Sequence, residues 1–277
     1  MDLIKKLDDM KEKRMVYRGQ PNHNWTLETS FKREIGLFSK LKKENESIEL
    51  MLIRLEKEMI SNFKSQYHLY TNDLLNDNND LYNLSVLQHY GAPTRLLDWS
   101  YSPFISTFFA VNSNFNDDAS IFALNLEYIT QVNQIKVDEF RVLTNSNSKS
   151  IDIIGYGKHY ADFKDRSKDE SYDEKIILMG YEPEKKNIRL ARQQGLFLVS
   201  SKIDVTFEEI LSSYNIVNGS NEDSDDIAIK LVIDKNIKME LINNLQMMNI
   251  SNEILFPEME GYCKSIKYRL LQRNKVN

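Results

Sequence analysis

The chain has 277 residues, of which 41% are hydrophobic and 28% are charged, the ordinary balance of a globular protein. This length fits one large α/β domain, or one domain that carries an insertion. The formal net charge of -5 argues against general nucleic-acid binding, because such binding needs a clustered cationic face. The net charge does not exclude a smaller basic patch on one part of the surface.

Cysteine, histidine and apolar runs narrow the protein class further. The only cysteine, Cys263, allows neither a disulfide framework nor a thiolate zinc site. The four histidines lack metal-binding spacing, so we expect no metal. The first 14 residues carry charges throughout, and no apolar run approaches transmembrane length. These features predict a cytoplasmic protein that makes no membrane contact.

The first part of the chain predicts a helix over residues 1–14, then a short strand, then a longer helix. The apolar run from Met15 to Tyr17 meets Arg18-Gly19-Gln20-Pro21, where glycine and proline turn the chain. Arg18 is therefore expected at the end of a strand, where its side chain can face a cleft. Apolar residues recur at helical spacing from Ser47 to Gln66, which is the clearest helix.

The stretch from Gln88 to Ala110 is the densest mixture of polar and apolar residues. Ser85 and Gln88 have capping-box spacing, and Gly91 suits the end of that helix. Ser102 followed by Pro103 has the form of a second helix start. The residues between these two helices are expected to form an anchored loop that supplies part of a cleft.

The rest of the chain predicts a sheet flanked by helices. Strands are expected at 120–126, 176–179, 196–200 and 227–233, and helices at 234–249 and 257–273. Cys263 is expected on the buried face of the last helix, as a small hydrophobic residue. Residues 127–187 include a long run of mixed charge and are expected to be a variable insert. The predicted fold class is α/β (α+β), with a mixed central sheet and flanking helices.

Several motifs together resemble the FRG domain family. They are Tyr17-Arg18-Gly19-Gln20, the block QHYGAPTRLLDW at 88–99, Phe108-Phe109-Ala110, the set Arg189, Gln193, Gly195 and Phe197, and Leu255-Phe256-Pro257 with Glu260-Gly261. The resemblance runs from about Val16 to about Ile266. It implies a single FRG-like domain over 1–277, interrupted by the insert at about 127–187. It also implies a role in bacterial defence or toxicity.

A fainter similarity links the chain to ADP-ribosyltransferases of the arginine–serine–glutamate class. Tyr17-Arg18-Gly19 resembles their first core strand, and the helix that ends in Phe108-Phe109-Ala110 resembles their middle segment. The likeness implies an ADP-ribosyltransferase-like fold in which Arg18 reaches the phosphates of NAD. The place of the family's catalytic acid falls at Gln193-Gln194-Gly195, which contains no glutamate.

Most candidate site residues allow two interpretations. Arg18 suits a bidentate anion clamp or an ion pair with Asp98. Arg95 suits an anion contact or a pair with Asp98, and His89 suits an acid–base role or a turn contact. The predicted catalytic residues are Arg18, His89, Asp98 and Gln193. The predicted ligand-binding residues are Tyr17, Gly19, Gln20, Tyr90, Thr94, Arg95, Trp99 and Arg189.

Two functions from different classes follow. The first is an effector directed at NAD or another nucleotide, an ADP-ribosyltransferase or NAD glycohydrolase with a protein or nucleic-acid target. The second is a non-catalytic module that uses the same pocket to sense a nucleotide or bind a partner. A nuclease is less favoured, because the sequence shows no paired-carboxylate metal site.

Overall fold

The computed structural model describes residues 14–35, 42–44, 46–72, 75, 79–134, 176–214, 228–259 and 261–266. The predicted helix over 1–14 and the middle of the predicted insert, 135–175, lie almost wholly outside these ranges. The described strands form one sheet in the order β4-β5-β2-β1-β3-β6. They are β1 (Met15–Gln20), β2 (Leu97–Ser100), β3 (Ala119–Asn125), β4 (Leu178–Tyr181), β5 (Gly195–Ser200) and β6 (Ala228–Ile233).

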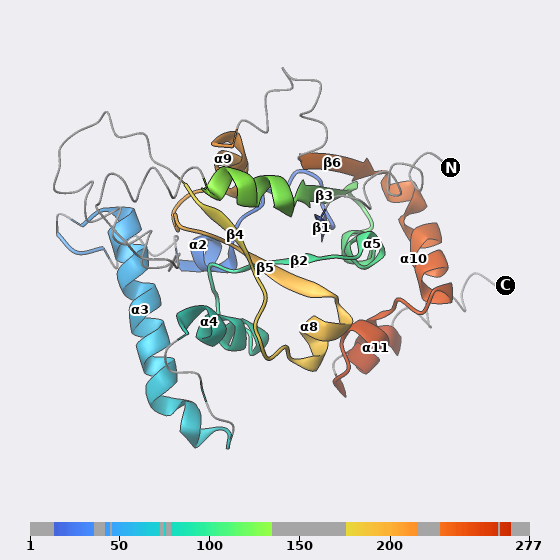
Figure 1. Cartoon of the computed structure of the whole chain (residues 1–277). Coiled ribbons are helices and arrows are strands. Elements are labelled where there is room, and N and C mark those ends of the chain that lie inside the picture. Colours follow the sequence, from blue (N-terminus) through green and yellow to red (C-terminus); the bar gives the residue numbers. More distant parts are fainter. Residues whose placement is uncertain are drawn as a thin grey trace.

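Helices flank this sheet (Figure 1). The long helix α3 lies beside one end of the sheet, and α10 and α11 lie beside the other. The helices with defined bounds are α2 (Ser30–Ile35), α3 (Ile48–Gln66), η2 (Tyr67–Leu69), α4 (Asp80–His89), α5 (Pro103–Val111), α8 (Ile188–Arg192), α9 (Phe207–Ser212), η4 (Lys235–Ile237), α10 (Lys238–Met247) and α11 (Asn252–Leu255). Residues 126–134 and 261–266 are also helical.

The predicted α/β class, with a central sheet and flanking helices, is confirmed. All five ladders between the described strands are antiparallel, so the expected mixture of parallel and antiparallel pairs is not found. Strand direction depends on how the connections run in space, and residue patterns within one strand do not encode it.

A serine caps both α3 and α5, and the cap predicted for α5 is confirmed. The Ser47 side chain accepts a hydrogen bond from the Leu50 amide at the start of α3. At the start of α5, Ser102 accepts from the Ile105 amide and Pro103 occupies the first turn. Gly91 follows α4 with a φ of 89°, the left-handed conformation that glycine adopts without strain.

The predicted capping box at Ser85 and Gln88 is wrong. Helix α4 begins at Asp80, and the Asn79 side chain caps it by accepting from the Tyr82 amide. Ser85 lies inside the helix, where its hydroxyl donates to the Tyr82 carbonyl at 2.7 Å. A serine hydroxyl that is bonded within its own helix does not mark a helix start.

The expected loop between α4 and α5 contains a strand. β2 pairs with β5 along its whole length, from Leu97 opposite Leu198 to Ser100 opposite Gly195. Leu97 and Trp99 are buried, whereas Asp98 between them is exposed. Four residues give too short an alternation to separate a strand from a loop.

The C-terminal prediction also needs correction. Cys263 is exposed, together with Met259 at 75% and Tyr262 at 44%. The short helix α11 precedes this segment and contributes the buried Leu255 to the core. The apolar stripe over 257–273 therefore did not identify the face that packs, and Cys263 is not a buried small hydrophobe.

The two faces of β1 enter different parts of the core. Val16 belongs to a cluster that includes Leu27, Trp99, Phe122 and residues of α9. The alternate residues Met15 and Tyr17 pack with α5 and α10 instead. This alternation places Arg18 on the face of Val16 and Gly19 on the face that meets α5.

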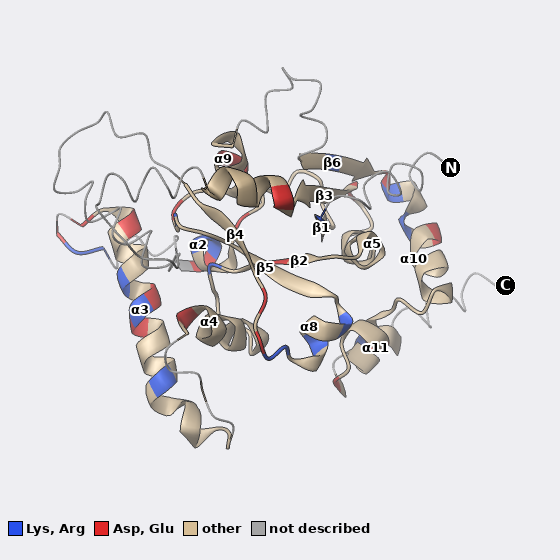
Figure 2. Cartoon of the chain, viewed as in Figure 1, with Lys and Arg blue, Asp and Glu red and all other residues tan. Residues whose placement is uncertain are grey.

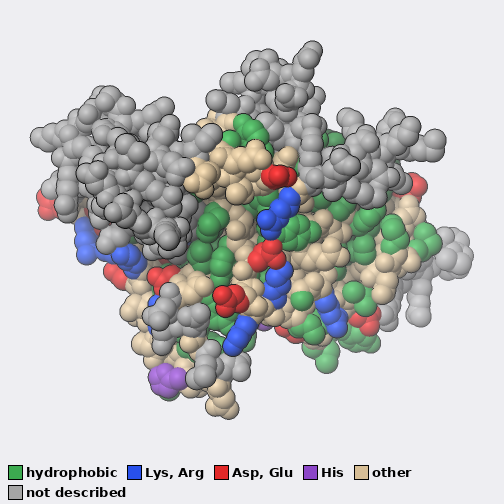
Figure 3. All heavy atoms as spheres, in the orientation of Figure 1, with side chains coloured by type: hydrophobic (Ala, Val, Ile, Leu, Met, Phe, Trp, Pro, Cys, Tyr) green, Lys and Arg blue, Asp and Glu red, His purple; other side chains and the backbone are tan. Residues whose placement is uncertain are grey.

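Charged side chains of both signs are interspersed on the described surface. They alternate along α3 and α10 (Figure 2), and acidic and basic groups follow one another across the face seen in Figure 3. Such mixing fits the modest net charge of -5. Among the described residues, no helix has the length and apolar character needed to cross a membrane.

Helix α5 packs directly on the backbone of Gly19. A Cβ atom at this position would lie 1.9 Å from the Ser106 carbonyl oxygen and 2.6 Å from the Ala110 amide nitrogen. Both are backbone atoms of a helix, so no side-chain rotation can relieve the overlap. Gly19 therefore allows the close approach that holds β1 against α5.

We expect Gly19→Ala to lower the free energy of unfolding by at least about 3 kcal/mol, because α5 must move away from β1. Chemical denaturation measures this change. Gly180→Ala is the matched control, since it also lies in a strand but its nearest neighbour is the Leu126 side chain at 3.3 Å. Equal stability losses in the two variants would contradict the role of Gly19.

Arg95, which lies just before β2, forms a buried ion pair with Glu56 of α3. Arg95 Nε donates to Glu56 Oε1 at 2.7 Å, and its Nη2 donates to Glu56 Oε2 at 2.6 Å. Arg95 Nη1 donates to the Ser200 carbonyl at the end of β5. The two side chains are 3% and 1% exposed, so Arg95 joins α3 to the sheet and does not face solvent.

Breaking this pair should destabilise the fold. We expect Arg95→Met to cost about 3–5 kcal/mol of unfolding free energy, because it leaves the Glu56 carboxylate buried without its partner. The double variant Arg95→Met/Glu56→Met should be more stable than Arg95→Met alone. Denaturant titration of both variants checks this order; a change within about 0.5 kcal/mol for Arg95→Met would assign Arg95 no structural role.

Candidate functional site

Arg18 lies in β1 where β1 and β2 stop pairing. Their only register pair is Tyr17 opposite Ser100. Next to this pair, the side chain of Arg18 links the two strands: its Nη1 donates to the Asp98 carbonyl at 2.5 Å. This bond anchors one end of the guanidinium and directs its Nε edge elsewhere.

The Arg18 pocket is a cavity of about 670 Å³ next to this junction. Its walls come from the end of β1, from the turn that follows it and from α2. The lining residues are Arg18, Gly19, Gln20, Pro21, Asn24, Trp25, Thr26, Glu28 and Arg33. This volume is in the range of small-molecule sites.

The turn after β1 is held in place by contacts with distant segments. The amine of Lys238, which is fully buried, donates to the Pro21 carbonyl at 2.8 Å. The His23 amide donates to the Asp118 carbonyl, and Asn22 donates to the Asp117 carboxylate. These contacts fix one wall of the pocket before any ligand arrives.

Two arginines give the pocket its positive charge. Burial lowers the pKa of the Arg18 guanidinium, the Asp98 charge partly offsets that effect, and the Arg33 charge lowers it further. Arg18 Nε is enclosed and donates to no acceptor among the described residues. A bound oxyanion would supply that acceptor and separate the two positive charges.

Sequence reasoning missed six residues of this pocket, among them Pro21 and Thr26. Trp25 is 52% exposed, Glu28 contacts Lys32 at 3.4 Å, and Arg33 lies on the exposed side of α2. Asn24 completes the group. The signal available in the sequence was a tryptophan within a polar stretch, seven residues after Arg18.

The central block holds the elements around the pocket together. The Thr94 backbone binds the start of α2. Its carbonyl accepts a hydrogen bond from the Phe31 amide, and its amide donates to the Ser30 hydroxyl. The Thr94 hydroxyl donates to Gln88 Oε1, and Gln88 Nε2 donates to Asp98 Oδ2 at 2.9 Å. Thr94 and Asp98 thus position α2, α4 and β2, and neither lines the pocket.

A second group of predicted site residues contacts the C-terminal segment. Gln193 Nε2 donates to the Leu255 carbonyl at 3.1 Å, and the Arg189 guanidinium lies 4.6 Å from the centre of the Phe256 ring. His89 Nε2 is 3.8 Å from Glu258 Oε1. The structure does not bring these three residues into the Arg18 pocket. They join α4 and α8 to the segment that carries the Leu255-Phe256-Pro257 motif.

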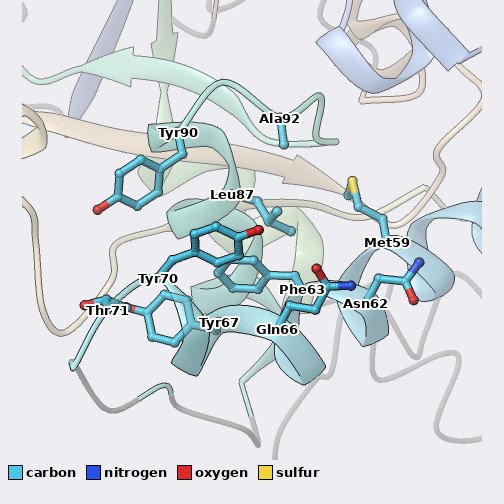
Figure 4. A pocket seen from close by; sticks show the side chains of 10 residues that line it. All are labelled: Met59, Asn62, Phe63, Gln66, Tyr67, Tyr70, Thr71, Leu87, Tyr90 and Ala92. Atoms are coloured by element: carbon cyan, nitrogen blue, oxygen red, sulfur yellow. The ribbon is translucent and has the colours of Figure 1, made fainter.

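The remaining predicted residues are dispersed. Tyr17 and Trp99 are 6% and 4% exposed and belong to the core. Tyr90 lines a different cavity of about 600 Å³ between α3, η2 and the end of α4 (Figure 4). Phe63, Tyr67 and Tyr70 surround that cavity with Tyr90, and no charged side chain lines it.

The described residues contain no group of three histidine, cysteine, aspartate or glutamate side chains that could hold a metal ion. The side chains that line the Arg18 pocket carry several kinds of binding group. These offer two guanidinium groups for an anion, one carboxylate, one exposed indole ring and the amides of Gln20 and Asn24.

The family model of the FRG domain matches residues 13–119. No curated protein and no solved structure matches the chain. The matched range contains the Arg18 pocket, the central block and the strands β1 and β2. The motifs at 189–197 and 255–261 lie outside it, yet Gly195 pairs with Ser100 of β2. Residues 13–119 of this chain therefore match the FRG domain model, and later segments complete the sheet to which their strands belong.

Proposed function

We propose that the Arg18 pocket binds a phosphorylated nucleotide of the NAD class. The observation that carries this proposal is the enclosed Arg18 Nε, which lacks an acceptor in a pocket that also contains Arg33. A phosphate oxygen is a natural acceptor for a guanidinium edge. Inside a partly enclosed pocket, the attraction is stronger than it is in bulk water.

Trp25 supports a nucleotide over a simple phosphate. Its ring is half-exposed at the rim of the pocket that contains both arginines. An indole face that is accessible beside a phosphate site suits stacking with a planar base. Two contacts of different chemistry in one cavity match a ligand with a charged end and a flat end.

The arginines can be tested with a variant that does not disturb the sheet. Arg33 is exposed on α2, so Arg33→Gln should fold normally. We expect it to weaken binding of NAD and ADP by about 10- to 100-fold, as befits the loss of a charge-assisted contact. Isothermal titration calorimetry measures the affinities.

Arg192→Gln is the matched control for this test, because Arg192 is an exposed arginine that donates to the Ile254 carbonyl outside the pocket. Its affinity for NAD should equal that of the unmodified chain. If Arg33→Gln also leaves the affinity unchanged, the proposed anion site is wrong.

Tryptophan fluorescence gives a second test. The chain has two tryptophans, and only Trp25 is accessible, since Trp99 is 4% exposed. We expect ADP to quench the emission, and Trp25→Leu to remove the quenching and weaken ADP binding by about 10- to 100-fold. Pyrophosphate has no ring, so its affinity should not change. An equal loss for both ligands would contradict stacking on Trp25.

A second candidate function is transfer of ADP-ribose from NAD, or NAD hydrolysis, and it is favoured by Glu28. This carboxylate lines the same pocket as Arg18, whereas Asp98 and Gln193 do not. In this reaction the bond between nicotinamide and ribose breaks, nicotinamide leaves, and ADP-ribose passes to an acceptor or to water. A carboxylate beside the ribose stabilises the oxocarbenium-like positive charge.

Nicotinamide release from NAD separates the two candidates. If the chain is an enzyme, Glu28→Gln should retain NAD binding and lower turnover by at least about 100-fold. The pair between Glu28 and Lys32 is partly open to solvent and joins residues one helical turn apart, so its loss should cost little stability and the variant should remain folded. Binding of NAD without nicotinamide release, with and without cell lysate, would assign the pocket to a non-catalytic module.

A further inference from the structure

Gln20, which lines the Arg18 pocket, has a side-chain acceptor that no described residue uses. It is the last residue of β1, only 6% exposed, and it lines the cavity. Its Nε2 donates to the Thr26 carbonyl at 3.2 Å. Its Oε1 is enclosed and accepts no hydrogen bond from any residue in the described part of the chain.

The orientation of this amide follows from its partner. The Thr26 carbonyl can only accept, so the NH₂ group must face it and the carbonyl oxygen of Gln20 must point the other way. Rotating the amide would place two carbonyl oxygens against each other. The unused group of Gln20 is therefore an acceptor, and it needs a donor.

Two of the residues that line the pocket each carry a buried polar atom without a partner, one a donor and the other an acceptor. Arg18 Nε and Gln20 Oε1 are both enclosed, both belong to lining residues, and they are not bonded to each other. A buried polar group without a partner is unfavourable, because it has lost its hydrogen bonds to water. A ligand that satisfies both groups must combine an oxyanion with a hydroxyl or amino donor.

We propose that Gln20 is the specificity-determining residue of the pocket, and that it selects ligands in which an O–H or N–H donor accompanies the phosphate. This inference rests on the proposed nucleotide-binding function. In a nucleotide, the groups with this chemistry are the ribose hydroxyls and the amino group of the base. Inorganic phosphate, pyrophosphate and deoxygenated analogues satisfy Arg18 and leave Gln20 unpaired.

Gln20 is better suited to this selection than Glu28, the other acceptor in the pocket. The Glu28 side chain is 25% exposed and faces Lys32, so solvent and a cation already compensate it. Gln20 is buried, so a ligand that covers it without donating leaves a permanently unpaired oxygen. Discrimination between ligands is greatest where a buried polar group is left unpaired by the wrong one.

The test compares ligands that differ by one donor. Calorimetry would measure the affinities of ADP, 2′-deoxy-ADP, 3′-deoxy-ADP, inosine diphosphate, which lacks the amino group of adenine, and pyrophosphate. We expect one of the three nucleotide analogues to bind about 10- to 100-fold more weakly than ADP. The analogue that loses affinity identifies the group that donates to Gln20.

Gln20→Met supplies the protein side of the comparison, since it keeps the length of the side chain and removes the acceptor. In this variant, ADP and the weakened analogue should bind with equal affinity, and pyrophosphate should bind as before. Persistence of the discrimination in Gln20→Met would overturn the role of Gln20. If the variant does not fold, the ligand series in the unmodified chain decides alone.

The same measurements separate the role of Gln20 from nucleotide binding by the pocket. If ADP binds and all three analogues bind equally well, Gln20 does not select the ligand, while the nucleotide pocket stands. If neither ADP nor pyrophosphate binds at millimolar concentration, the nucleotide pocket itself is wrong, and the inference about Gln20 fails with it.

Discussion

The hydrogen bond from the Arg18 guanidinium to the Asp98 carbonyl is the contact on which the pocket depends. It lies where the ladder between β1 and β2 has a single register pair, so a side chain takes over the link between the two central strands. One end of the guanidinium is thereby anchored, and its enclosed Nε is left for another acceptor. Arg18 therefore contributes to the fold through Nη1 and to the candidate site through Nε.

The residues of the central block act by holding elements in position. Arg95 holds α3 through its ion pair with Glu56, and the Thr94 backbone is hydrogen-bonded to the start of α2. Asp98 accepts hydrogen bonds from Gln88 and Arg18. Because α2 carries Arg33 into the pocket, the contact at Thr94 determines where the second positive charge lies. The block therefore shapes the site without lining it, which explains why so many polar residues occur in one short stretch of chain.

Much of the local structure could be predicted. The serine cap of α5 and the terminal Gly91 of α4 follow from hydrogen-bonding rules that act within a few residues. The site was predicted less well, because Arg95, Gln193 and Arg189 have reactive side chains whose partners, Glu56, Leu255 and Phe256, are distant in sequence. A side chain's chemistry does not reveal which partner it meets, and buried or exposed surroundings change its role entirely.

The sequence by itself determined the α/β class, the cap of α5 and the position of Arg18 near the end of a strand, because these depend on short-range periodicity and backbone hydrogen bonding. It also contained the motifs that resemble the FRG domain family, whose model matches residues 13–119. Only the tertiary structure decided that Trp25, Glu28 and Arg33 share a pocket with Arg18, and that His89, Arg189 and Gln193 hold the C-terminal segment instead. The physical reason is that a pocket is formed by packing between elements, and packing depends on contacts that no local pattern encodes.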